Sequence, residues 1–219
     1  MIKTDAQLQR DVMDELRWDP AVGQAEIGVA VKDGVITLSG QVETFAKRFA
    51  AMKAVERVAG VRAVAGDIHV HIPAAAERTD TEIAHATANA LDWDVEVPVP
   101  GVKARVQNGW VWLEGDVDWQ YQRIAAERAV RYLTGVRGVT NALRIKPQAS
   151  APDVKQRIEN ALKRSAEVEA RNIKVEAVNG QVTLRGTVHS YAERKDAESA
   201  AWAAPGVHSV EDDLAVVAS

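Results

Sequence analysis

His69 and His71 are the first residues of this 219-residue sequence whose types and spacing could do chemistry. Side chains two positions apart on a strand share a face, and two imidazoles with one further ligand could hold a metal ion. Ile68, Val70 and Ile72 alternate with them. This alternation favours the simpler interpretation that the histidines lie on the solvent side of a strand, and we predict no metal site.

Acidic clusters are the second candidate, at Asp92-Trp93-Asp94, Asp116-Val117-Asp118-Trp119 and Glu211-Asp212-Asp213. A calcium loop needs a longer fixed pattern with an internal glycine. We therefore interpret these clusters as charged loop residues that are exposed to solvent. The sequence contains no Cys, which excludes thiolate ligands, disulfides and cysteine catalysis. No Ser-His-Asp or paired-carboxylate pattern recurs in it. We therefore predict no catalytic residue, no cofactor and no enzyme activity.

Tryptophan is the more informative residue type, since the sequence has 6 Trp but only 2 Phe. Trp110 and Trp112 lie two positions apart and must share a face of a strand, while Val111 and Leu113 take the other. If the aliphatic pair is buried, the indoles face outward. Together with Trp119 they form a candidate contact surface for a partner domain, a membrane interface or an unfolded client. The alternative is that a neighbouring unit or linker covers them.

The sequence is built from three copies of one unit. Segments 33–40, 108–115 and 179–186 align, with offsets of about 75 and 71 positions (109−34 and 180−109). Trp18 and Trp93 obey the first offset at the end of the opening helix, which predicts a shared structural role such as covering the core or an interdomain contact. Length alone would suggest one or two domains, but the repeats predict three, at residues 1–73, 77–147 and 152–219.

Each unit reads as helix, strand, strand, helix, strand. Leu8, Val12 and Leu16 recur with helical spacing, and Pro152-Asp153 would begin the third opening helix. Asp-Gly or Asn-Gly then predicts a type I′ hairpin in every unit. An alanine-rich second helix follows, with Ala46, Ala50 and Ala54 as the buried face in the first unit and Ala192, Ala197, Ala200 and Ala201 in the third. We predict structural turn and cap roles for Gly34, Gly40, Gly60, Gly109, Gly115, Gly135, Gly180, Gly186 and Gly206.

A last strand closes each unit, at 64–72, 139–145 and 210–217, and a helix joins it to the strand before. These two strands should therefore run parallel with a right-handed crossover. The predicted fold class is α+β: three tandem αββαβ units, each a small mixed three-stranded sheet with two helices on one face.

The residues that lead into the last strand of each unit resemble the motif of a known family. They read Gly60-Val61-Arg62-Ala63-Val64, Gly135-Val136-Arg137-Gly138-Val139 and Gly206-Val207-His208-Ser209-Val210. With the turn glycine and the order of elements, this motif resembles the BON domain over nearly the whole chain. The resemblance implies attachment to phospholipid or membrane surfaces, envelope or osmotic stress, and periplasmic chaperoning. It implies no catalytic residues.

Charge limits the partners further. The sequence has 27 basic and 31 acidic residues, a net charge of −4, spread evenly over the units. We therefore expect no nucleic-acid partner and no bulk attraction to an anionic bilayer. No stretch approaches the ~20 apolar residues of a transmembrane helix, so an integral membrane protein is not expected. No signal peptide is visible, which predicts a cytoplasmic protein, or a periplasmic one if a leader was removed.

The predicted function is that of a non-enzymatic, stress-associated binding protein that attaches to phospholipid membrane surfaces or hydrophobic, membrane-associated partners. The alternative is a holdase-like chaperone or a protein–protein interaction scaffold. The identity of the partner and the oligomeric state stay open.

Overall fold

The computed structural model describes residues 3–23, 25–98, 100–146, 154–165, 168 and 170–217. The predicted unit limits at 1, 147, 152 and 219, and the first turn at Pro152-Asp153, lie outside these residues. No described helix is long and apolar enough to cross a membrane.

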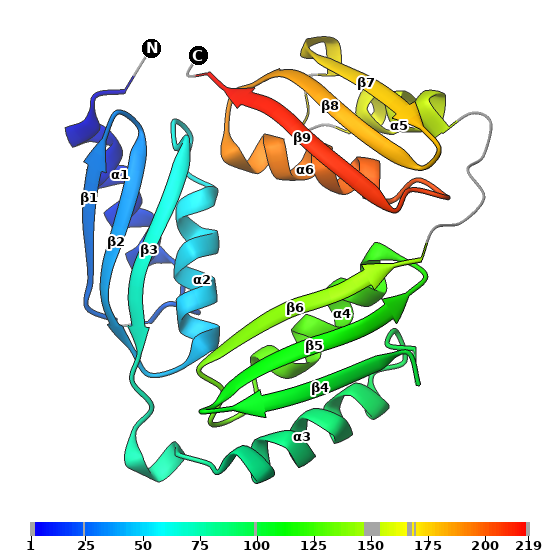
Figure 1. The fold of residues 1–219 in the computed structure, drawn as a ribbon. Coiled ribbons are helices and arrows are strands. Elements are labelled where there is room, and N and C mark those ends of the chain that lie inside the picture. The colour runs from blue at the N-terminus through cyan, green and yellow to red at the C-terminus, as the bar shows by residue number, and fades with distance from the viewer. Residues whose placement is uncertain are drawn as a thin grey trace. The chain divides into compact units, whose positions relative to one another are not determined.

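Each repeat runs helix, strand, strand, helix, strand, as predicted (Figure 1). Repeat 1 contains α1 (Asp5–Trp18), β1 (Ile27–Lys32), β2 (Val35–Val42), α2 (Phe45–Glu56) and β3 (Ala63–Val70). Repeat 2 contains α3 (Asp80–Trp93), β4 (Val102–Gln107), β5 (Trp110–Val117), α4 (Gln120–Arg131) and β6 (Gly138–Ile145). Repeat 3 contains α5 (Val154–Arg164), β7 (Ile173–Val178), β8 (Gln181–Val188), α6 (Tyr191–Trp202) and β9 (Ser209–Val216). Short 3₁₀ turns, Ala74–Ala76 and Ala170–Asn172, precede α3 and β7.

The three sheets have the strand orders β1-β2-β3, β4-β5-β6 and β7-β8-β9. In repeats 2 and 3 the first pair is antiparallel and the second pair is parallel. The mixed sheet and the α+β class are therefore confirmed.

The hairpin turns follow the expected chemistry. Asn108 has φ 52° and Gly109 has φ 74°, which are the two positive angles that a type I′ turn requires. The sequence did not reveal what fixes each turn against the opening helix. The Asp80 carboxylate accepts hydrogen bonds from the backbone N–H groups of Asn108 and Gly109, both at 2.8 Å. Asp5 holds the first turn in the same way, so the carboxylate at the start of the helix ties it to the hairpin.

One face of the central strand carries the core of repeat 2. Val111 and Leu113 are fully buried, and they pack in one cluster with Ile83 and Leu91 of α3 and Val130 of α4. Both helices therefore cover the same face of the sheet, and the opposite face of β5 is left open.

The prediction of a buried alanine face on the second helix is partly wrong. In α2 the buried residues are Ala51, Ala54 and Val55, whereas Ala46 and Ala50 are only half-buried. Apolar residues lie on all sides of this helix, so its sequence does not indicate which face is buried. In α6 the predicted Ala197 and Ala201 are buried.

The two helices of repeat 1 are joined by an ion-pair network. The Arg57 guanidinium contacts Glu15 at 2.9 Å and Asp19 at 2.6 Å. Its hydrogen bond lowers the pKa of the Asp19 carboxyl below the ordinary value. A carboxyl with a lowered pKa in the folded state stabilises above its unfolded pKa, and this contribution is lost as the pH falls through the folded pKa.

Arg57→Ala is therefore expected to reduce the free energy of unfolding of repeat 1 by up to about 1 kcal/mol at pH 7. Below about pH 4 the difference from wild type should begin to shrink, because the carboxyl becomes protonated as the pH falls from its ordinary pKa through its lowered folded pKa. Urea unfolding at pH 7 and pH 3 measures both values, and Arg17→Ala, which removes the exposed pair with Asp14, is the control. An equal loss at the two pH values would contradict the role of the carboxylates.

Candidate functional site

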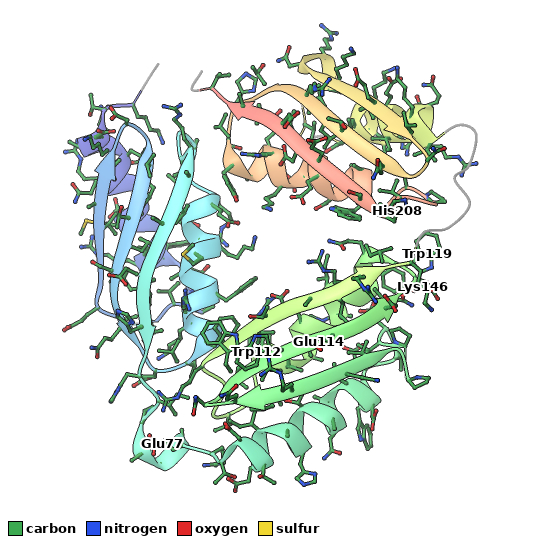
Figure 2. The ribbon with its side chains drawn as sticks, viewed as in Figure 1. Glu77, Trp112, Glu114, Trp119, Lys146 and His208 are labelled. Carbon is green, nitrogen blue, oxygen red and sulfur yellow. The ribbon has the colours of Figure 1, made fainter. Side chains whose placement is uncertain are left out.

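The open face of the repeat 2 sheet holds Trp110 and Trp112. Both indoles are half-buried, on the side of β5 opposite to the buried Val111 and Leu113, as the alternation predicted. Across the antiparallel pair they lie opposite Gln107 and Arg105, and Glu114 lies opposite Lys103. We call this surface the Trp face; it consists of Lys103, Arg105, Gln107, Trp110, Trp112, Glu114, Gly138 and Thr140 (Figure 2).

Trp110 lies flat on the neighbouring strand. A Cβ atom added to Gly138 would meet the ring carbons of Trp110 at 2.5–2.7 Å, so the indole occupies the space that any other residue would fill. Its Nε1–H donates a hydrogen bond to the Thr140 hydroxyl at 2.8 Å. One face of this indole therefore packs on the strand and the other is turned outward.

Trp112 is held by its neighbours on both sides. Its ring centroid is 6.3 Å from that of Trp110, with an angle of 40° between the planes. The Arg105 guanidinium carbon lies 4.2 Å from the Trp112 centroid, which is a cation–π contact. Arg105 also donates a hydrogen bond to the Gln107 side chain at 3.3 Å. The rings and the polar side chains beside them thus form one ordered surface.

Only repeat 2 carries this arrangement. Repeat 1 has Val35 and Ala63 at the positions of Trp110 and Gly138, and repeat 3 has Gln181 and Ser209. Trp110 and Gly138 thus occur together, and the glycine makes room for the ring. Alignment of the repeats could have revealed the pair, but only once the parallel register of β5 and β6 had been assumed.

Trp119, the third tryptophan of the predicted surface, lies elsewhere in the repeat. It is half-buried at the N-terminal end of α4, and Figure 2 shows it at a different end of the sheet from Trp112. The Gln122 side chain accepts hydrogen bonds from the backbone N–H groups of Asp118 and Trp119, at 2.9 and 3.0 Å. These bonds form the half of a capping box in which the N3 side chain binds the N-cap backbone, whereas the indole, which has no acceptor, cannot form the other half. The structure brings together two of the three predicted residues.

The repeated tryptophans do not have the first of the two roles predicted for them, covering the core. Trp18 and Trp93 are 83% and 86% exposed, so they do not cover the cores of their repeats, and Val95 is 100% exposed. Arg128, in the last turn of α4, contacts Asp94 at 3.6 Å and Glu96 at 2.6 Å. This ion pair brings the end of α4 beside the end of α3.

We call Trp93 and Val95, at and just after the C-terminal end of α3, the apolar tip of repeat 2. The hydrogen bond to Glu96 raises the pKa of the Arg128 guanidinium above its ordinary value, so this guanidinium beside the tip stays charged.

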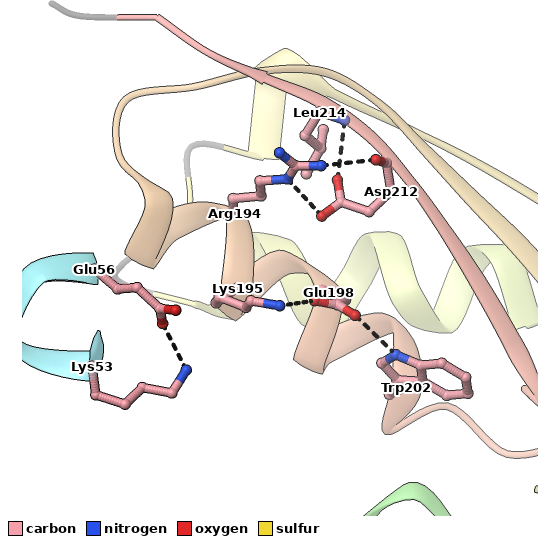
Figure 3. A network of polar contacts seen from close by, with 8 residues as sticks. All are labelled: Lys53, Glu56, Arg194, Lys195, Glu198, Trp202, Asp212 and Leu214. Carbon is pink, nitrogen blue, oxygen red and sulfur yellow. Dashed lines mark hydrogen bonds and ion pairs between the residues drawn. The ribbon is translucent and has the colours of Figure 1, made fainter. Parts of the chain in front are cut away.

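The acidic clusters are not free loop charges. Asp116 and Asp212 lie on strands: Asp116 pairs with Arg144 at 3.0 Å, and Asp212 pairs with Arg194 at 2.7 Å (Figure 3). Asp212 also accepts a hydrogen bond from the Leu214 backbone at 3.0 Å. The Asp212–Arg194 pair, which is largely shielded from solvent, therefore ties β9 to α6, whereas the exposed Asp116–Arg144 pair contributes little to stability.

The predicted histidine pair does not form a metal site in the part of the chain that the structure describes. His69 and His71 are exposed, and no group of three or more His, Cys, Asp or Glu among the described residues is placed to hold a metal ion.

The BON domain family model matches residues 4–71, 79–147 and 150–218. Over 115 residues the chain is 37% identical to osmotically-inducible protein Y of Escherichia coli (strain K12). That match covers 48% of this chain and 56% of the relative, so it spans little more than half of the relative's length.

Two solved structures of CdsD, a structural protein of the type III secretion system of Chlamydia trachomatis, also match at 14% identity. One aligns over 96% of this chain and 92% of its own with a TM-score of 0.28. The other, the C-terminal domain, aligns over 98% and 100% with a TM-score of 0.27.

Proposed function

This chain belongs to the BON domain family, with three copies of the domain in tandem, and we propose that it is a non-enzymatic, stress-associated protein that attaches to phospholipid membrane surfaces. The observation that carries this proposal is the apolar tip of repeat 2. Trp93 and Val95 protrude with 86% and 100% of their surface exposed, and Trp18 protrudes in the same way in repeat 1.

The chemistry of the tip suits the boundary between lipid and water. Trp has a large apolar ring and a polar N–H group, so it favours the level of the lipid headgroups. Burying one large apolar side chain contributes about 1.5–3 kcal/mol. Burial of Trp93 and Val95 would therefore support a dissociation constant of about 1 mM.

Electrostatic attraction contributes little to this attachment. The chain has a net charge of −4, so an anionic bilayer would repel it weakly. We therefore expect binding to neutral vesicles to equal or exceed binding to anionic ones, with little dependence on salt.

Co-sedimentation with vesicles tests the proposal. The full chain is expected to pellet with phosphatidylcholine vesicles and no better with vesicles that contain phosphatidylglycerol. Trp93→Ser combined with Val95→Ser should weaken binding at least a hundredfold, since the loss of two such side chains costs about 3 kcal/mol or more. Trp110→Ala combined with Trp112→Ala is the matched control, and its binding should stay near wild type.

Two results would contradict the proposal. If the full chain pellets with neither kind of vesicle, membrane attachment is wrong, and suppression of client aggregation without lipid would then favour the holdase alternative. If only the Trp110/Trp112 variant loses binding, the attachment surface is the one that the sequence indicated, with Trp110, Trp112 and Trp119 as its candidates.

A further inference from the structure

The Trp face is ordered in a way that the proposed membrane attachment does not use. Trp110 rests on Gly138 and donates to Thr140, and Trp112 lies under Arg105, so neither ring is free to protrude. Repeats 1 and 3 lack both indoles at these positions. A rigid pair of rings that occurs in one repeat, on a face that the core does not need, indicates a ligand surface.

We propose that the Trp face binds a neutral oligosaccharide, with a sugar ring stacked on the outward face of Trp110. A pyranose ring presents C–H bonds on its faces and hydroxyl groups around its edge. The flat indole provides the apolar contact for such a ring. The side chains beside it provide the hydrogen-bonding partners that fix its orientation.

Donors and acceptors lie on the same face of the sheet. Arg105 and Lys103, on β4, can donate to hydroxyl oxygens, while Glu114, on β5, accepts from hydroxyl groups. All three side chains are exposed. The bond from Arg105 to Gln107 orients the guanidinium and leaves further N–H donors. Hydroxyl groups, which both donate and accept, match this mixed set.

The charges on this face argue against other occupants. A nucleic acid would bring its phosphates close to Glu114 and to the Asp116–Arg144 pair, and Lys103 and Arg105 leave a net charge of only +1 to attract them. An apolar peptide would cover Lys103, Arg105 and Glu114 without satisfying them, which is costly. A cationic ligand would meet the Arg105 guanidinium over Trp112. A neutral, hydroxyl-rich partner meets none of these penalties.

The indole N–H signals of the ¹⁵N-labelled full chain report on this binding directly. The probes are chitohexaose, cellohexaose and maltohexaose. We expect at least one of them to shift the Trp110 and Trp112 signals with a dissociation constant of about 1 mM, while the Trp18 and Trp93 signals stay in place. Trp→Phe variants assign the signals.

Two variants test the geometry. Trp110→Ala removes the stacking ring, and Gly138→Ala keeps the ring but displaces it from the strand, since the new Cβ would lie 2.5 Å from it. Each should weaken binding at least tenfold, whereas Trp93→Ala, at the apolar tip, should bind as wild type does. Thermal unfolding checks that the variants are folded.

The proposal is wrong if no hexasaccharide shifts either indole signal up to about 10 mM, or if Gly138→Ala binds as tightly as wild type. Vesicle binding that survives such a result would leave the membrane proposal standing, because that proposal rests on a different surface.

Discussion

Gly115→Ala is expected to lower the thermal midpoint of repeat 2 by about 15 °C. Gly115 lies inside β5 with φ +130°, and a Cβ atom built there would overlap the carbonyl oxygen of Gly101. That oxygen already accepts a hydrogen bond from the Asp116 backbone at 3.2 Å, so it is not free to move away. Backbone strain and overpacking cost about 1–3 kcal/mol each, a large share of the about 4–10 kcal/mol expected for some 70 residues.

Hydrogen exchange followed by mass spectrometry resolves the loss by repeat. Peptides of repeat 2 should lose protection, whereas those of the other repeats should keep it. Gly138→Ala is the matched control in the same sheet, because the atoms nearest to its Cβ would belong to a side chain, the ring of Trp110, and not to the backbone, so it should cost less than Gly115→Ala does, about 1 kcal/mol. If the two variants lose equal protection, the close approach at Gly115 does not limit stability.

The same constraint explains why a second glycine recurs in every copy. Gly40, Gly115 and Gly186 all have φ between 130° and 136° and lie within β2, β5 and β8, not at a turn or a cap. The sequence revealed that these positions are structural, since they recur at fixed offsets. It could not show the reason, because the clash involves the carbonyl of the residue that precedes the neighbouring strand, Gly101 for Gly115 and Asn172 for Gly186.

Local chemistry predicted the elements that depend on it. The Asn108-Gly109 turn follows from the positive φ that few residues tolerate, and the helix face of Leu8, Val12 and Leu16 follows from periodicity. All three of these leucine and valine side chains are buried, as expected.

Burial at the end of an element was less predictable. The shared offset of Trp18 and Trp93 showed that the two positions are equivalent, but exposure there depends on what packs beside the helix end. The Trp face was partly predictable, because alternation places Trp110 and Trp112 on one side. Its polar members on β4 and β6 required the strand register, which only the fold provides.

Leu113→Ala is expected to reduce the free energy of unfolding of repeat 2 by about 3 kcal/mol. Leu113 lies at the centre of β5, is fully buried, and packs in the cluster shared by α3 and α4. Truncation removes three carbon atoms from a site where the sheet and both helices limit collapse, so a cavity remains. Denaturant unfolding of the full chain, with hydrogen exchange to identify the repeat, measures the loss.

Glu114→Ala, one position further on the same strand, is the control and should change stability by less than about 0.5 kcal/mol, since its side chain is exposed. Successive side chains of β5 point to opposite faces of the sheet. Substitutions on the buried face should therefore affect stability, and substitutions on the open face should affect binding. Leu113→Ala should weaken the fold while the Trp110 and Trp112 indole signals still respond to the hexasaccharide. Trp110→Ala should do the reverse. A loss of binding in Leu113→Ala while repeat 2 is still folded would mean that the core sets the geometry of the Trp face, and the two faces would then not be independent.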